Sequence, residues 1–188
     1  PYRHEGAKTL AYELAEAVTL DAAPDVVVHP TAHGTGVVGL HKGFRDLRKR
    51  SQVDAAPRLY AVQPDGCAPV VDAVEEGAET VSAVEHPDTI CGPLEVPEPT
   101  GGRQVLEALR VNGHGAVAVS DDALLEGATG LAADGLTMGA TGGAAVAGAR
   151  QLAGRDAFDP DDVLVLVNPT TGNKEDDILR SHLMKQGI

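Results

Sequence analysis

The chain has 188 residues, enough for one domain with a sizeable core, and its 28 acids and 15 bases give a formal net charge of −13. This charge argues against nucleic acid or an anionic membrane surface as a partner, because phosphate groups are bound by Lys and Arg. The two cysteines, Cys67 and Cys91, form no CxxC pair, so we expect neither a disulfide framework nor a thiolate zinc site.

Lysine is scarcer than arginine, 5 against 10, and aromatic residues make up only 3% of the chain. We interpret this composition as that of a salt-adapted (halophilic) cytoplasmic protein, with an ordinary acidic protein as the alternative; loss of the fold in low salt would support the first. No run reaches 18 apolar residues and no signal peptide stands out. The sequence starts at Pro1 without a methionine, so we expect it to belong to a longer protein.

Helices and strands alternate along the sequence. Helical spacing of apolar residues predicts a helix over 7–17, and after a break at 21–24 the continuous run Val26–Val28 predicts a strand covered on both faces. A short loop then leads into a helix whose apolar residues are Val37, Leu40, Phe44 and Leu47. Further helices are predicted over 67–76, 101–112, 121–133, from 142 and over 174–186, and further strands over 58–64, 116–119 and 163–167.

This alternation predicts an α/β fold in which residues 1–188 form a single domain. We expect an open, mainly parallel sheet of four to five strands with helices on both faces. The strand Val163–Val167 is apolar throughout, so we place it centrally in the sheet. Thr100 and Ser120 are the predicted N-caps of the helices that follow them.

Ligands of such sheets bind at the carboxyl ends of the strands, where the loops 31–36, 120–122 and 168–173 fall. The first loop contains Ala32, His33, Gly34, Thr35 and Gly36 and opens a helix. Backbone N–H groups there can bind a phosphate. The loop has neither a Walker motif nor a full GxGxxG spacing, and a tight turn that binds nothing is the alternative.

Four segments in this order resemble threonine synthases, which are pyridoxal-phosphate enzymes of fold type II, the tryptophan synthase β family. The quoted stretches are PYRHEGAKT, HPTAHGTGVVGLHKGF, the region from HPDTICGPLEVPEP to AVAVSDD, and VLVLVNPTTGNK. The resemblance implies that the chain is the C-terminal part of the large domain of such an enzyme. The implied cofactor is pyridoxal 5'-phosphate, and the implied partners are an amino-acid substrate, the missing N-terminal portion and a second subunit in a homodimer.

The resemblance also assigns roles to residues. The phosphate loop of the family matches Ala32, His33, Gly34, Thr35 and Gly36. The residue that binds the pyridine nitrogen matches Thr171, with its neighbour Thr170 as the alternative. A hydroxyl at this place leaves the ring nitrogen largely unprotonated, which moderates the ring as an electron sink.

The sequence departs from the family at two places. In the segment 137–142 many relatives carry an acid, and Gly139 stands there instead. None of the five lysines matches the lysine that binds the cofactor covalently, so we expect no catalytic residue in this chain; Lys8 is expected on a helix surface.

The most specific function implied is the conversion of O-phosphohomoserine to threonine and phosphate, by a carbon–oxygen lyase type of β,γ-elimination and replacement. The alternatives are another fold type II enzyme, such as a threonine dehydratase or a cysteate or cysteine synthase, and a non-catalytic relative that binds a phosphate ligand. No metal site is expected, because His29, His33 and His41 lack a supporting pattern of ligands.

Overall fold

The computed structural model describes residues 2–17, 23–111, 114–185 and 187. Its four strands are β1 (Val26–Pro30), β2 (Arg58–Pro64), β3 (Gly115–Val119) and β4 (Leu164–Leu166). The helices are α1 (Tyr2–Ala7), α2 (Thr9–Ala17), α3 (Thr35–Lys49), α4 (Pro69–Glu75), α5 (Gly102–Val111), α6 (Asp121–Gly130), α7 (Ala140–Ala153) and α8 (Asp176–Lys185). Short 3₁₀ turns are η1 (Asp65–Cys67), η2 (Gly92–Leu94), η3 (Ala132–Asp134) and η4 (Gly172–Lys174).

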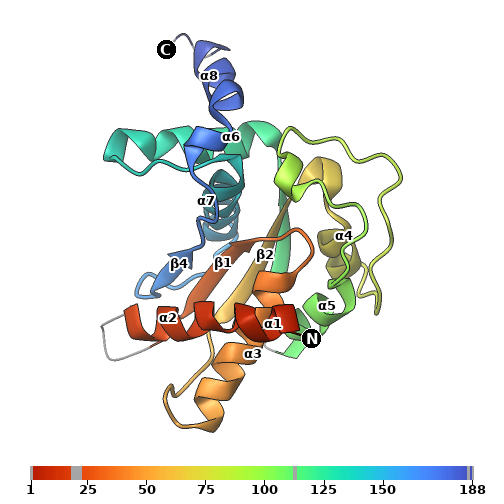
Figure 1. The fold of residues 1–188 in the computed structure, drawn as a ribbon, viewed down its shortest axis with the longest axis vertical. Helices are drawn as coiled ribbons and strands as arrows, with labels where there is room; N and C mark the ends of the chain where they lie inside the picture. Colours follow the sequence, from red (N-terminus) through yellow and green to blue (C-terminus); the bar gives the residue numbers. More distant parts are fainter. Residues whose placement is uncertain (1, 18–22, 112–113, 186, 188) are drawn as a thin grey trace.

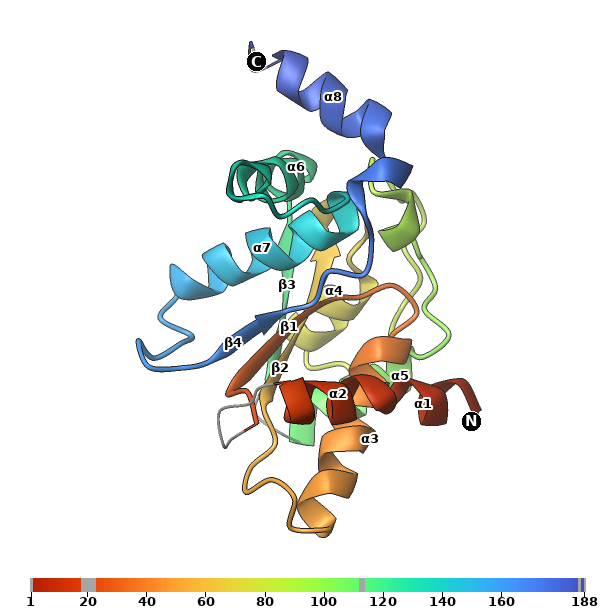
Figure 2. The same ribbon diagram turned by 60° about the vertical axis from the view of Figure 1, so that its left-hand side comes forward.

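The strands form one sheet in the order β3-β2-β1-β4, and every neighbouring pair is parallel (Figure 1). Helices α6 and α7 lie on one side of this sheet, and α3, α4 and α5 lie on the other (Figure 2). This is the predicted arrangement of a parallel sheet covered on both faces.

The burial of β1 explains why its sequence is continuously apolar. Val26 and Val28 belong to the apolar cluster under α6 and α7, whereas Val27 belongs to the cluster under α3, α4 and α5. All three valines are fully buried. Because side chains alternate between the faces of a strand, a strand covered twice needs an apolar residue at every position.

The helix predicted over 7–17 is two shorter helices that meet at Lys8. Both pack on α3: Ala7 at the end of α1 faces Gly39, and Ala11 in α2 faces Gly43. Lys8 bonds to Asp46 at 2.7 Å and to Glu5 at 2.5 Å, with only 14% of its side chain exposed. Lys8 therefore lies in the turn between the two helices, at the surface, where its ion pairs with these two acids cover most of its side chain.

The expectation that Val163–Val167 is a central strand is wrong. β4 covers only Leu164–Leu166 and pairs with β1 alone among the described residues, so it lies at an edge. Val163 is 38% exposed and Leu166 is 36% exposed. An apolar run shows that the faces of a strand are suited to burial, but it does not show how many neighbours the strand has.

The other predicted elements are found with shifted ends. The helix predicted to reach residue 133 ends at Gly130, and the helix from 142 begins at Ala140. Residues 112 and 186, where two predicted helices end, and the start of the break at 21–24 lie outside the described residues. None of the helices in the described ranges is both long and apolar enough to cross a membrane.

Candidate functional site

Helices α3, α4, α5, α6 and α7 begin at the carboxyl edge of the sheet, and side chains cap the starts of α4, α6 and α7. Gln63 Oε1 accepts hydrogen bonds from the N–H groups of Val70 (2.8 Å) and Val71 (3.3 Å) at the start of α4. Ser120 Oγ accepts from Ala123 N–H at 3.2 Å in α6, as its predicted role as N-cap requires. The start of α7 is capped by Glu175, whose Oε2 accepts from Ala140 N–H at 2.5 Å.

The start of α3 has no such cap. Its N-cap residue is Gly34, which has no side chain to act as a cap, its first turn carries no acid, and among the described residues no other side chain bonds to its first N–H groups. The first N–H groups of a helix have no partner within the helix, and they carry the positive end of its dipole. The start of α3 is thus open to an external anion, unlike the starts of α4, α6 and α7, and it lies in the predicted phosphate loop.

Gly34 is required by its conformation and by its surroundings. Its φ of 85° lies in the left-handed region, which favours glycine. A Cβ at this position would also clash with the Val105 side chain, because the loop packs closely on the start of α5. His33 O accepts from Gly101 N–H at 3.0 Å, and this bond holds the two segments together.

The two histidines beside the loop have different surroundings. His33 is exposed, and its Nδ1 accepts from Thr100 N–H at 3.4 Å, so its ring is turned toward the start of α5. His29 lies beneath the loop against Gly36, with Nδ1 buried and without a partner. Burial lowers the pKa of His29 to about 4, so its ring is neutral at pH 7.

A buried network fixes the base of the loop. Thr31 is 1% exposed, its N–H donates to Val62 O at 2.8 Å, and its hydroxyl donates to His29 O at 2.9 Å. Gln63 is fully buried and donates from Nε2 to Thr31 O at 3.2 Å, while its Oε1 caps α4. Sequence reasoning did not single out Gln63, although a lone amide inside an apolar strand was a usable signal.

The loop that follows β4 lies beside the first loop, because β4 and β1 are neighbours and Val167 N–H donates to Val28 O at 3.0 Å. Thr171, the predicted partner of the ring nitrogen, is exposed. The adjacent Thr170 has a hydroxyl oxygen that is buried and has no hydrogen-bond partner. Thr171, being exposed, is the one of the two whose hydroxyl a ligand at this edge can reach.

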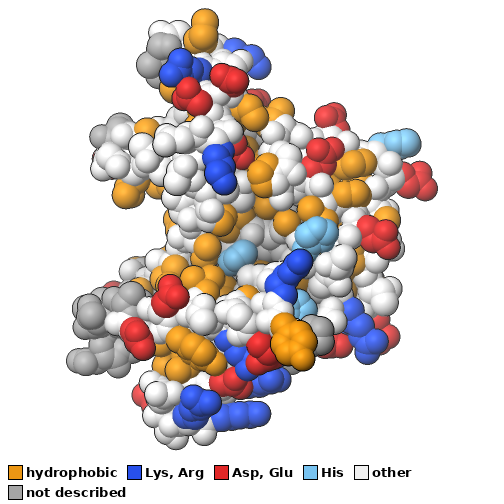
Figure 3. Space-filling view, in the orientation of Figure 1, with side chains coloured by type: hydrophobic (Ala, Val, Ile, Leu, Met, Phe, Trp, Pro, Cys, Tyr) orange, Lys and Arg blue, Asp and Glu red, His pale blue; other side chains and the backbone are white. Residues whose placement is uncertain are grey.

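Near the start of α7 the Cys91 thiol lies 3.5 Å from Thr141 Oγ1. Burial raises the pKa of Cys91 to about 11, so the thiol stays protonated and does not act as a nucleophile at neutral pH. Histidine side chains lie near the middle of the face shown in Figure 3, but among the described residues no three His, Cys, Asp or Glu side chains are grouped to hold a metal ion.

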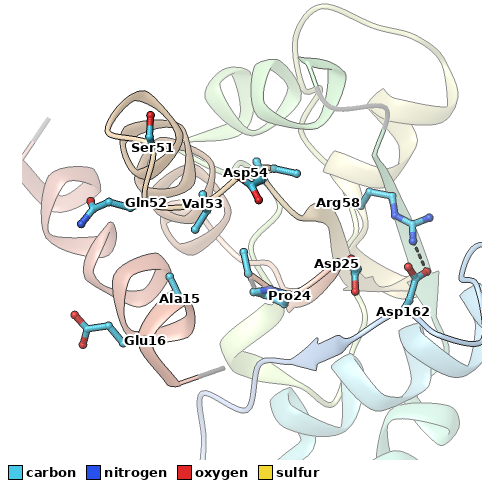
Figure 4. Close-up of a pocket in the computed structure, with 13 residues that line it drawn as sticks. Ala15, Glu16, Pro24, Asp25, Ser51, Gln52, Val53, Asp54, Arg58 and Asp162 are labelled. Atoms are coloured by element: carbon cyan, nitrogen blue, oxygen red, sulfur yellow. Dashed lines mark hydrogen bonds and ion pairs between the residues drawn. The ribbon is translucent and has the colours of Figure 1, made fainter. Parts of the chain in front are cut away.

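A pocket of about 740 Å³ lies at the opposite, amino edge of the sheet (Figure 4). Its arginine, Arg58, is paired with Asp162 and donates to Ala157 O at 2.9 Å. The carboxylates of Glu16, Asp25 and Asp54 also line the pocket. Because acids outnumber its one paired base, this pocket is unsuited to a phosphate, and the carboxyl edge remains the candidate site.

The carboxyl edge thus combines an open helix start with an exposed threonine on the neighbouring loop, as expected of an α/β protein that binds a phosphorylated ligand. Residues 1–169 match the model of the family described as "Pyridoxal-phosphate dependent enzyme", and the chain belongs to this family. Pyridoxal 5'-phosphate, the predicted cofactor, is the cofactor of this family. The predicted α/β fold of the chain, with its parallel sheet, is also confirmed.

The chain is similar to threonine synthases of two archaea. It is 30% identical to that of Methanosarcina acetivorans over 92% of this chain and 42% of the relative, and 27% identical to that of Methanocaldococcus jannaschii over 94% and 44%. The chain therefore spans less than half the length of these curated relatives.

Two solved structures share its fold. An L-serine ammonia-lyase from Rhizomucor miehei superposes with a TM-score of 0.73 at 24% identity, over 95% of this chain and 56% of the other. Maize serine racemase gives a TM-score of 0.74 at 17% identity, over 97% and 54%.

Proposed function

We propose that this chain is the cofactor-binding part of a pyridoxal-phosphate enzyme that converts O-phosphohomoserine and water to threonine and phosphate. The similarity to two threonine synthases over more than nine-tenths of the chain supports this reaction. The proposal includes an N-terminal portion of the same protein, which supplies the lysine and most substrate contacts, and a homodimeric, cytoplasmic, salt-adapted enzyme.

The observation that carries the proposal is the distribution of helix caps at the carboxyl edge. The start of α3 is open, whereas Gln63, Ser120 and Glu175 cap α4, α6 and α7. Next to it, on the loop after the neighbouring strand, lies Thr171, which is exposed. A phosphate and a ring nitrogen on one ligand would satisfy both features.

In this proposal residues 32–36 hold the cofactor phosphate through backbone N–H groups, and the Thr35 hydroxyl adds a further donor. Thr171 bonds to the pyridine nitrogen, with Thr170 as its alternative. The cofactor supplies the electron sink that allows bonds at the β and γ carbons of an amino acid to break and form. The chain orients the cofactor and sets the electrostatic environment of its ring.

The lysines of this chain support a covalent anchor elsewhere in the protein. Lys8 bonds to Glu5 and Asp46, and Lys42 bonds to Glu5, on the outer surface of α3. Both side chains are thereby engaged with acids of α1 and α3. We place the lysine that binds the cofactor outside residues 1–188, because none of the five lysines matches the one that the resemblance implies.

The test uses the full-length protein. Pyridoxal phosphate is titrated into the cofactor-free protein while its near-ultraviolet and visible absorption is followed, and borohydride then tests for covalent attachment. Incubation with O-phosphohomoserine should release phosphate and threonine in equal amounts. Ammonia and a 2-oxo acid formed from threonine would identify a dehydratase instead. A protein that shows no change in cofactor absorption and releases no phosphate would refute the proposal and leave a non-catalytic phosphate-binding relative.

A further inference from the structure

The loop 31–36 contains two glycines, and each of them packs against a side chain from another element. A Cβ on Gly34 would collide with the Val105 side chain of α5, and a Cβ on Gly36 would collide with the ring of His29 from β1. Nε2 and Cε1 of this ring both lie closer than 3.0 Å to the point that the Gly36 Cβ would occupy. Two side chains therefore fix the height of the turn whose N–H groups are open to a phosphate.

The strand beneath the loop leaves the His29 ring little freedom to move away. His29 pairs with Ala61 in the parallel ladder between β1 and β2. The carbonyl of His29 also accepts from the Thr31 hydroxyl at 2.9 Å, and Thr31 O accepts from Gln63 Nε2 at 3.2 Å. The backbone of His29 is thus held by the sheet and by the base of the loop, so its ring is a fixed support for Gly36.

Packing alone does not explain a histidine at this position. Nδ1 of His29 is buried without a hydrogen-bond partner, and such a group lowers the stability of a protein. A leucine would fill the same space without this cost, and the preceding residues Val26–Val28 of the strand are all apolar. The imidazole therefore indicates a use for a ring that can take up a proton.

A phosphate at the start of α3 would provide that use, because its negative charge would lie close to the ring under Gly36 and would favour the protonated imidazole. In the free protein burial lowers the pKa of His29 to about 4, and nearby backbone groups of Pro30 and His29 oppose this effect. No charged side chain of α3, β2 or any other described element contributes to the shift of this pKa. The one titratable side chain of the loop itself, His33, has its ring turned toward Thr100.

We infer that His29 is a positioning residue of the phosphate site: its ring, seated under Gly36, holds the first turn of α3 in place for the phosphate and takes up a proton when the phosphate binds at mildly acidic pH. This inference rests on the proposed function. The ring acts through the turn and through its charge, without touching the ligand. Since the bound form takes up the proton more readily than the free form, a fall in pH should favour binding to the parent over binding to a variant that cannot titrate.

The first test is a double-mutant cycle in the full-length protein, with the dissociation constant of pyridoxal phosphate at about pH 7.5 as the readout. Gly36→Ala should weaken binding about tenfold, because the new Cβ displaces either the ring or the turn. In the background of His29→Ala the same change should weaken binding by less than about twofold, since the space under residue 36 is then free. Gly6→Ala is the matched control, because it changes an exposed glycine of α1 with open space around it and should leave binding unchanged.

A second variant separates the proton from the packing. His29→Leu fills the space under Gly36 but cannot titrate, so at about pH 7.5 it should bind pyridoxal phosphate within about threefold of the parent. At about pH 5.5 the parent should gain at least about twofold over His29→Leu, because only the parent can take up a proton at this position. His86→Leu removes an exposed histidine between α4 and α5, and it should follow the parent at both pH values.

The outcomes are distinct. If the parent protein binds no pyridoxal phosphate, the proposed function fails and this inference with it. If the parent binds, but Gly36→Ala weakens binding equally with and without the His29 ring, the ring does not support the turn and only this inference is overturned. The same holds if the ratio of the dissociation constants of His29→Leu and the parent is equal at the two pH values.

Discussion

Replacing Gln63 with Leu should strongly destabilise the protein, although the two side chains have similar size. Gln63 is fully buried, and its amide satisfies Thr31 O, Val70 N–H and Val71 N–H. Leucine would leave these three backbone groups unpaired inside the protein. An unsatisfied buried group costs about 1–3 kcal/mol, and the added apolar burial offsets part of this, so we expect a loss of about 2–4 kcal/mol.

The measurement is equilibrium unfolding of the full-length protein in urea, without added cofactor. Gln104→Leu is the matched control, because it makes the same chemical change at an exposed position of α5 and should alter stability by less than about 0.5 kcal/mol. Equal stability of the two variants would show that Gln63 does not join the base of the loop to α4. The cofactor should also bind more weakly to the Gln63 variant, because Thr31 O loses its donor.

Three further predictions concern the same edge of the sheet. Thr35→Asp should stabilise the cofactor-free protein by about 0.3–1 kcal/mol, since it supplies the missing acid at the start of α3. The same variant should weaken pyridoxal phosphate binding at least about tenfold, because its carboxylate repels the phosphate. Thr35→Asn is the neutral control, and unchanged binding in the Asp variant would place the phosphate elsewhere. The pKa of His29 is lowered in the folded protein, so the unfolded chain binds a proton at this residue more readily. The free energy of unfolding should therefore fall by up to about 3 kcal/mol as the pH is lowered from 6.5 to 4. His29→Gln should lack this loss in urea titrations across that range, and identical pH profiles of variant and parent would contradict a neutral buried ring. Ser120→Ala should cost about 1 kcal/mol through the lost cap on α6, whereas Ser181→Ala, exposed on α8, should unfold like the parent.

The strands were predictable because the sheet is covered on both faces. Val26, Val27 and Val28 are all buried although they point to different sides, and no loop or exposed strand face has this pattern. The order of the strands was not predictable in the same way. β4 has an equally apolar sequence, but it lies at the edge of the sheet. Strands pair through backbone N–H and C=O groups, which every residue except proline carries in full, so the side chains do not show which strands are neighbours.

The phosphate loop was predictable as a location, since a small-residue loop between a buried strand and a helix occurs at a known place in parallel sheets. Its supporting residues were harder to recognise. Gln63 caps α4 from the preceding strand, and Glu175 caps α7 from 35 residues further along the chain. A cap from a distant residue leaves no local motif, because only the fold brings the donor and the acceptor together.

The two ends of the site differ in electrostatic character, and this difference fixes how a ligand can bind. At one end the start of α3 offers free N–H groups and the positive end of a helix dipole. At the other end the start of α7 is already neutralised by Glu175, whose carboxylate lies beside the Thr170 hydroxyl. A phosphate placed there would face a negative charge and find its helix donor occupied, whereas an uncharged ring would meet no such repulsion. We therefore expect the phosphate of pyridoxal phosphate at the start of α3 and its ring toward the loop after β4, because the start of α7 is already capped by a carboxylate.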